Sequence, residues 1–156
     1  MNGTRARIVR HRIAAEATSS APPAEVFALL RESDTWPAWS FFDACELEHA
    51  GRDEPFGVGA IRVFVTRATR AREQVTELIP DRKLSYVLLS GLPLHDYRGE
   101  VILCPLDTGG TLIHWAASFE SRLGTGWFWR RFIRRTLATI AAQLAAAAEP
   151  TPPHAA

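Results

Sequence analysis

The sequence has 156 residues, which suits one domain with one sizeable core and leaves too little chain for two. Apolar residues make up 47% and charged residues 22%, a balance typical of a globular chain rather than a disordered one. With 18 basic and 17 acidic residues the net charge is only +1, so we expect no general attraction to nucleic acid.

Several kinds of functional site are missing from the sequence. Cys45 and Cys104 match no metal or redox spacing, and we interpret them as half-buried thiols rather than a disulfide. There is no glycine-rich phosphate loop, no serine nucleophile elbow and no His, Cys, Asp or Glu set with metal-ligand spacing, so we expect neither a metal nor a cofactor. The basic N-terminus lacks a following apolar run, and no stretch is long enough to span a bilayer, which favours a cytoplasmic protein.

The first third of the chain predicts a strand and two short helices. Residues 8–18 alternate loosely between apolar and polar and are typical of a strand. Pro22 and Pro23 suit a helix start, and residues 24–30 form a good short helix. Residues 35–42 contain four aromatic side chains and one proline, and we interpret them as a second short helix or turn that closes one end of the core.

The rest of the chain predicts an antiparallel meander followed by one long helix. Short apolar runs separated by turn signals indicate consecutive strands, over residues 44–50, 59–67, 70–79, 84–92, 97–103 and 111–120. Helical spacing then begins at Gly126 and runs to Ala148, with a helix of roughly 33 Å at about 1.5 Å per residue. Because prolines cannot continue a helix, we expect one domain over residues 1–149 and a disordered tail over residues 150–156.

These elements define an α+β fold in which a sheet of seven strands lies on the long C-terminal helix. A strongly curved sheet cannot touch a straight helix along its whole length, so we expect a gap near one end. This architecture is the helix-grip fold: a curved seven-stranded antiparallel sheet wrapped on a long C-terminal helix, with two short helices after the first strand.

Four segments resemble one known superfamily. They are Ala21–Leu30 (APPAEVFALL), Trp36–Trp39 (WPAW), Val75–Tyr86 (VTELIPDRKLSY) and Gly109–Trp115 (GGTLIHW). In this order and at these distances they resemble the SRPBCC superfamily, which contains the START-like domains and the polyketide cyclase/dehydrase and lipid-transport group. The resemblance covers nearly the whole chain and implies the helix-grip fold. It does not imply one reaction, because the family includes carriers, receptors and ring-closing enzymes.

Strand and helix periodicity, together with this resemblance, select eight candidate ligand-binding residues. Tyrosines in an apolar cavity can orient a ligand, a glycine leaves space, and aromatic residues line walls and mouths. For each tyrosine, core packing with the hydroxyl at the rim is the alternative, and Gly99 could equally mark a bend or bulge. The eight candidates are Trp39, Phe64, Tyr86, Tyr97, Gly99, Trp115, Trp129 and Ile133. No catalytic residue is assigned.

Charged residues on the predicted strands say less about function than the aromatic candidates do. Strand alternation places His114 on the outer face of the sheet. One predicted strand contains Arg70, Arg72, Glu73 and Glu77, and we expect these side chains to face outward in cross-strand pairs. A pair that faces inward would instead be a functional candidate, because burying a charge in a cavity is energetically costly.

The segment 127–135, WFWRRFIRR, combines aromatic residues with four arginines at the start of the long helix. We interpret it as a solvated face whose arginines pair with acids on the sheet. Contact with an anionic lipid surface is the alternative.

Three functions follow from these observations. The first is binding or transport of a small hydrophobic ligand, lipid-like or similar to an aromatic polyketide, between the sheet and the C-terminal helix. The second is a polyketide cyclase/dehydrase-type enzyme that uses the same cavity and requires an ionisable group inside it. The third is a membrane- or protein-docking module that acts through residues 127–135. We expect a small hydrophobic ligand as partner, no nucleic acid, and a monomer or homodimer.

Overall fold

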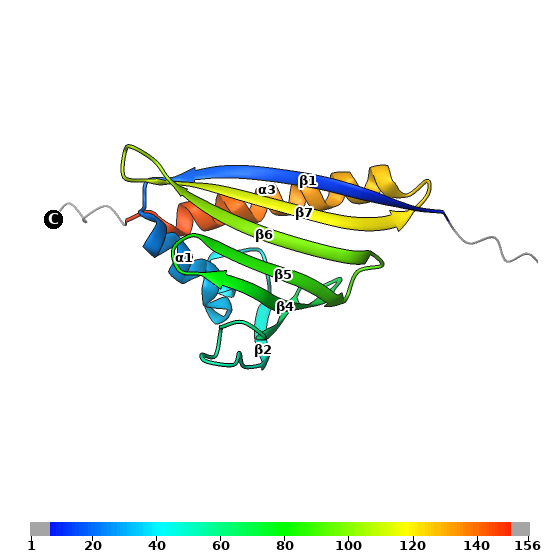
Figure 1. The fold of residues 1–156 in the computed structure, drawn as a ribbon, viewed down its shortest axis with the longest axis horizontal. Helices are drawn as coiled ribbons and strands as arrows, with labels where there is room; N and C mark the ends of the chain where they lie inside the picture. Colours follow the sequence, from blue (N-terminus) through cyan, green and yellow to red (C-terminus); the bar gives the residue numbers. More distant parts are fainter. Residues whose placement is uncertain (1–6, 151–156) are drawn as a thin grey trace, which may run out of the picture.

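One antiparallel sheet, one long helix and a short helical segment build the fold, which the structure, a computed structural model, describes for residues 7–150 (Figure 1). The strands are β1 (Ile8–Ser19), β2 (Ala44–His49), β3 (Ile61–Val65), β4 (Arg70–Ile79), β5 (Lys83–Ser90), β6 (His95–Pro105) and β7 (Thr111–Arg122). The helices are α1 (Pro23–Arg31), the 3-10 turn η1 (Ser33–Thr35), α2 (Trp36–Trp39) and α3 (Gly126–Ala148).

The sheet has seven strands in the order β1-β7-β6-β5-β4-β3-β2, and every neighbouring pair is antiparallel. The strands from β2 to β7 therefore follow one another as a meander, and β1 adds to the far edge beside β7. Because β1 and β2 lie at opposite edges, the chain between them has to cross the sheet. The segment α1-η1-α2 makes this crossing and closes one end of the molecule (Figure 1).

The long helix α3 lies against β1 and β7 rather than over the middle of the sheet (Figure 1). Its buried stripe follows the helical period, and β7 supplies the facing stripe at alternate positions. The Ser19 hydroxyl at the end of β1 donates a 2.9 Å hydrogen bond to the carbonyl of Ala145, which ties the edge strand to the last turns of the helix. The helix residues that carry this stripe are Ile133, Leu137, Ile140, Ala141, Leu144, Ala145 and Ala148.

The sequence-based prediction of the fold class is confirmed: an α+β fold, a curved seven-stranded antiparallel sheet and a long C-terminal helix. The two short helices after the first strand are also present. The assignment of residues 1–149 to one domain stays a prediction, and most of the predicted tail (151–156) lies outside the described residues. Within residues 7–150, no helix is both long and apolar enough to cross a membrane.

Candidate ligand-binding cavity

A cavity of about 310 Å³ lies between α3 and the part of the sheet from β3 to β6, with Trp115 of β7 also in its wall. Its walls are mainly apolar, and exposed side chains at its rim mark the mouth. The mouth lies where the segment after α2, the β3–β4 turn and the first half of α3 come together. The lining residues are Trp36, Phe41, Phe42, Phe64, Thr66, Ala68, Thr69, Ala71, Glu73, Tyr86, Leu88, Leu92, Tyr97, Trp115, Phe132, Ile133, Thr136, Leu137 and Ile140.

Trp36 is the centre of the aromatic wall. Its side chain is 2% exposed, and its indole N–H donates a 3.0 Å hydrogen bond to the carbonyl of Leu29 in α1. The ring centroids of Phe64 and Phe42 lie 4.6 and 5.9 Å from that of Trp36, and Trp115 meets it edge-on at 6.1 Å. Such tilted and edge-on contacts are the favoured geometries for aromatic pairs, so this wall is well packed.

One ion pair lies inside this apolar setting. Arg62 on β3 and Glu73 on β4 are direct cross-strand partners, and Arg62 Nη2 lies 3.4 Å from Glu73 Oε2. The Arg62 side chain is 1% exposed and the Glu73 side chain 16% exposed, and Glu73 lines the cavity. Two buried nitrogens of Arg62, Nε and Nη1, have no hydrogen-bond partner among the described residues.

Aromatic rings surround the Arg62 guanidinium. Its central carbon lies 5.1 Å from the ring centroid of Phe64, 5.6 Å from that of Trp36 and 5.9 Å from that of Tyr86. Contacts of this kind attract a cation to the ring faces and stabilise a buried guanidinium in part. The cation is thus held behind the cavity wall, and the carboxyl of Glu73 is the group that meets the cavity.

Burial of the carboxyl raises the pKa of Glu73 from 4.5 to about 7, although the Arg62 charge acts in the opposite direction. A carboxyl group in this state changes its protonation near neutral pH. It accepts hydrogen bonds when ionised and can donate one when neutral. Glu73 is therefore suited to orienting a polar ligand atom or to moving a proton.

Two tyrosines lie beside Glu73 on the cavity wall. The Tyr86 hydroxyl accepts a 3.0 Å hydrogen bond from the indole N–H of Trp115, and the ring of Tyr97 lies 6.3 Å from that of Tyr86. Burial raises the pKa of both phenols above the ordinary value, so both stay neutral. They are hydrogen-bonding groups rather than anions.

Gly99 allows the Tyr86 ring to lie flat on β6. The two residues are cross-strand partners, and a Cβ at Gly99 would overlap the tyrosine ring. The space that the sequence assigns to a ligand at Gly99 is thus filled by Tyr86. Gly99 leaves room for the Tyr86 ring and is not itself among the residues that line the cavity.

Five of the eight predicted residues line the cavity, namely Phe64, Tyr86, Tyr97, Trp115 and Ile133. Gly99, Trp39 and Trp129 are not among the lining residues. Trp39 and Trp129 are half-buried and pack against the edge of the core. The Trp39 indole N–H donates to the hydroxyl of Thr35 at 3.2 Å, whereas Trp129 meets Phe128 and Phe132 edge-on.

The prediction that Glu73 faces outward is wrong, because its side chain lines the cavity. We expected an outward side chain, as found for Arg70 and Arg72, which pair with Glu46 and Glu48 at 2.9 and 2.7 Å. The β4–β5 register shifts between Val75 and Glu77, so Glu77 faces outward although alternation from Glu73 would place it inside. Alternation backward from the buried Val75 would have placed Glu73 in the core.

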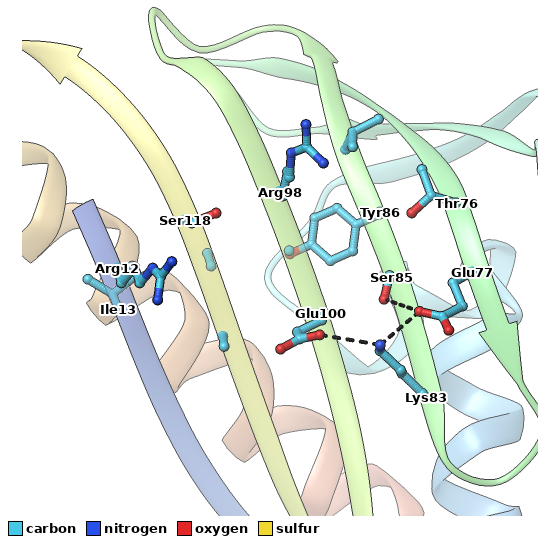
Figure 2. A pocket seen from close by; sticks show the side chains of 14 residues that line it. Arg12, Ile13, Thr76, Glu77, Lys83, Ser85, Tyr86, Arg98, Glu100 and Ser118 are labelled. Carbon is cyan, nitrogen blue, oxygen red and sulfur yellow. Dashed lines mark hydrogen bonds and ion pairs between the residues drawn. The ribbon is translucent and has the colours of Figure 1, made fainter. Parts of the chain in front are cut away.

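The outer face of the sheet carries a second, more open depression of about 530 Å³ (Figure 2). Four of its side chains pair with one another: the Lys83 ammonium lies 2.8 Å from Glu77 and 3.5 Å from Glu100, and Ser85 donates to Glu77 at 3.3 Å. These partly exposed groups therefore already have partners within the depression. The less open interior cavity, with its mainly apolar walls and single carboxyl, is the better candidate for a ligand site.

The sequence matches the model of the family described as polyketide cyclase / dehydrase and lipid transport over residues 10–149, and the chain belongs to this family. The superfamily resemblance predicted from the four motifs is therefore confirmed. A search of curated proteins found no match.

Solved structures share the fold at low sequence identity. A START superfamily protein from Mycobacterium smegmatis is 13% identical with a TM-score of 0.76, over 88% of this chain and 97% of that one. XoxI from Bacillus cereus is 15% identical with a TM-score of 0.70, over 88% and 94% of the two chains. A point mutant of norcoclaurine synthase from Thalictrum flavum, in complex with a transition-state analogue, is 14% identical with a TM-score of 0.73, over 91% and 96%.

We expect Gly99→Ala to destabilise the protein by about 1–3 kcal/mol, because the added methyl group overlaps the Tyr86 ring. Without that overlap, alanine in a strand would be neutral or slightly stabilising. Urea unfolding of Gly99→Ala, Tyr86→Leu and the double variant measures the coupling. The cost of Gly99→Ala should largely disappear in the Tyr86→Leu background, and an unchanged cost there would contradict the proposed packing.

Glu73 should lower the stability of the protein as the pH rises. Its pKa is about 7 in the folded protein and 4.5 when unperturbed, so the folded state binds the extra proton between these values. The unfolding free energy should therefore fall between about pH 4.5 and 7, by at most roughly 3–4 kcal/mol from this group. Urea unfolding of the wild type and Glu73→Gln across this range isolates the effect as the difference between them.

Glu77→Gln is the matched control on the same strand. Hydrogen bonding to Lys83 lowers the pKa of the exposed Glu77 carboxyl, so its stabilising contribution is present at neutral pH and is lost as the pH falls. The two variants should thus show pH dependences of opposite sign. A difference between wild type and Glu73→Gln that stays constant with pH would contradict a buried, titrating Glu73.

Proposed function

We propose that this protein binds a small, mainly apolar molecule in the cavity between α3 and β3–β6, with one polar group of the ligand directed at Glu73. The observation that carries the proposal is the combination of a mainly apolar cavity of about 310 Å³, open at a mouth, with one carboxyl group in its wall. Ligand sites are typically apolar cavities with a few polar groups that fix the orientation of the ligand.

The size of the cavity favours a compact ligand. Cavities for small molecules are typically about 300–1,000 Å³, and this one lies at the lower end of that range. Aromatic side chains form much of its wall, which suits a flat ring system more than a long acyl chain. Within the family description, this favours a ligand similar to an aromatic polyketide over a long-chain lipid.

The polar group of the ligand should be a hydroxyl or a carbonyl. The ionised carboxylate of Glu73 accepts a hydrogen bond from a hydroxyl, and the neutral carboxyl donates one to a carbonyl. Tyr86 already accepts a bond from Trp115, so its own hydroxyl proton remains to be donated. An apolar ligand with no polar group would leave these buried groups unsatisfied, which is costly.

A second candidate function is a cyclase- or dehydrase-type enzyme that uses the same cavity. The observation that favours it is Glu73 itself, since a carboxyl with a pKa of about 7 is suited to general acid–base catalysis near neutral pH. The likeness to norcoclaurine synthase adds only a fold-level analogy. Glu73 would carry the proton, and the neutral tyrosines would orient the substrate.

Filling the cavity should abolish ligand binding. Leu88 lies opposite Glu73 on β5 and lines the cavity, whereas its neighbour Leu89 is 42% exposed and does not. A thermal-shift screen of hydrophobic compounds, guided by mass spectrometry of molecules released from the denatured protein, identifies a stabilising ligand. Leu88→Trp should lose the shift and Leu89→Trp should keep it. Equal shifts in both variants would place the ligand elsewhere.

Glu73→Gln separates binding from catalysis. For a ligand with a hydroxyl group, the substitution should weaken binding by about tenfold, because a hydrogen bond to a charged acceptor contributes about 1.5–3 kcal/mol and the amide oxygen replaces part of it. If the protein is an enzyme, turnover should fall by about a hundredfold or more while binding changes much less. Glu77→Gln should change neither quantity. Unaltered binding and turnover in Glu73→Gln would refute a role for this carboxyl.

A further inference from the structure

An exposed aromatic and cationic surface lies on the first half of α3. Trp127, Phe128 and Phe132 are 72%, 47% and 41% exposed, and Phe41, after α2, is 39% exposed beside them. Together with arginines of α3 they line a shallow depression of about 510 Å³. The aromatic face consists of these four side chains plus Arg130, Arg131, Arg134 and Arg135.

The side chains of this aromatic face form parallel rows along the helix. Residues four apart lie on the same side of a helix, so Phe128 and Phe132 form one row, and their rings stack at 6.1 Å. Trp127, Arg131 and Arg135 form the next row, and Arg130 and Arg134 follow. The surface therefore changes from apolar to cationic across adjacent rows, as in helices that lie at a membrane interface.

The four arginines have no carboxylate partner within 4 Å among residues 7–150. Our interpretation that they pair with acids on the sheet is thus wrong. Burial and the charge of Arg130 both lower the pKa of His11 on β1, which is consistent with a positive local potential. The whole chain has a net charge of only +1, yet four arginines without a carboxylate partner among residues 7–150 lie on this one helix.

The aromatic face is continuous with the cavity mouth. Phe41, Phe132 and Thr136 line both the surface depression and the interior cavity. An apolar molecule could therefore pass from a layer that covers this face into the cavity without crossing water. This link rests on the proposed ligand-binding function of the cavity.

We propose that the aromatic face docks the protein on a bilayer that contains anionic lipid, with the cavity mouth against the membrane. The aromatic rings would enter the interface and the arginines would contact lipid phosphates. A second copy of the chain fits this face less well, because a symmetric contact would bring two sets of four unpaired arginines together.

Vesicle co-sedimentation of the full chain tests this proposal. The protein should bind vesicles of phosphatidylcholine with phosphatidylglycerol, bind vesicles of phosphatidylcholine alone much more weakly, and be released by added salt. The double variant Arg131→Gln/Arg135→Gln should weaken binding about 30-fold, since each basic residue near the surface contributes about 1 kcal/mol. Trp127→Ala should also weaken binding, through lost apolar contact.

The matched control is Arg70→Gln/Arg72→Gln, which removes the same charge from β4, where both arginines are paired. It should bind anionic vesicles like the wild type. The double variant on α3 should keep the ligand-induced thermal shift without vesicles, because neither arginine lines the cavity. Failure of docking is therefore distinguishable from failure of ligand binding.

Four results would overturn the proposal. Equal binding to both vesicle types would show that the arginines do not select anionic lipid, and binding to neither would show that the face does not dock on a bilayer. A Trp127-dependent dimer in light scattering without vesicle binding would identify the face as a self-interface. Binding to nucleic acid without binding to anionic vesicles would identify a polyanion of another class as the partner.

Discussion

The geometric mismatch between a curved sheet and a straight helix creates the site. α3 packs along β1 and β7, while the strands from β3 to β6 close round a space that the helix does not fill. Side chains from α3, from the segment after α2 and from the sheet meet around that space, so residues distant in sequence form one cavity wall. Neither a flat sheet nor a helix over its centre would leave this volume.

The Arg62–Glu73 pair is the most costly part of this arrangement. Removing two charges from water costs more than one ion pair usually returns, and hydrophobic residues of similar size would often be as stable. Here the contact is long, at 3.4 Å, and two Arg62 nitrogens have no partner among the described residues. Stability alone is therefore a poor explanation for such a pair, which agrees with the ligand-binding role that we propose for Glu73.

The surrounding residues support this interpretation of the pair. The aromatic rings of Trp36, Phe64 and Tyr86 lie around the cation, so the Arg62 charge is kept away from the ligand space. Glu73 is the one carboxyl among the described residues that line that space, and Tyr86 and Tyr97 line it as well. A few polar groups in a mainly apolar wall can give a bound molecule a preferred orientation.

The sequence predicted the elements well because their signals are local. The period of apolar residues, the turn residues and the long helical stripe identify all seven strands and α3 within a few residues. Phe64, Trp115 and Ile133 were placed on the cavity wall by the same periodicity. The family resemblance added the way in which these elements assemble.

The site was less predictable, because it depends on departures from regular geometry. The register shift between Val75 and Glu77 reverses the outward and inward faces within β4. Glu73 and Glu77 therefore point to opposite faces of the sheet, and a prediction of one orientation for both had to fail for one of them. At Gly99 the sequence shows that a side chain is missing but not which neighbour occupies the space. The structure shows that the ring of Tyr86 occupies it. Trp39 and Trp129 have the composition of a cavity wall, yet lie just outside it.

A crystal structure of the protein with its most stabilising ligand is the most direct test of this account. The account predicts ligand density between α3 and β3–β6, with a polar ligand atom within hydrogen-bond distance of the Glu73 carboxyl. Ligand in the outer-face depression near Lys83, or an interior closed by repacked side chains, would contradict it.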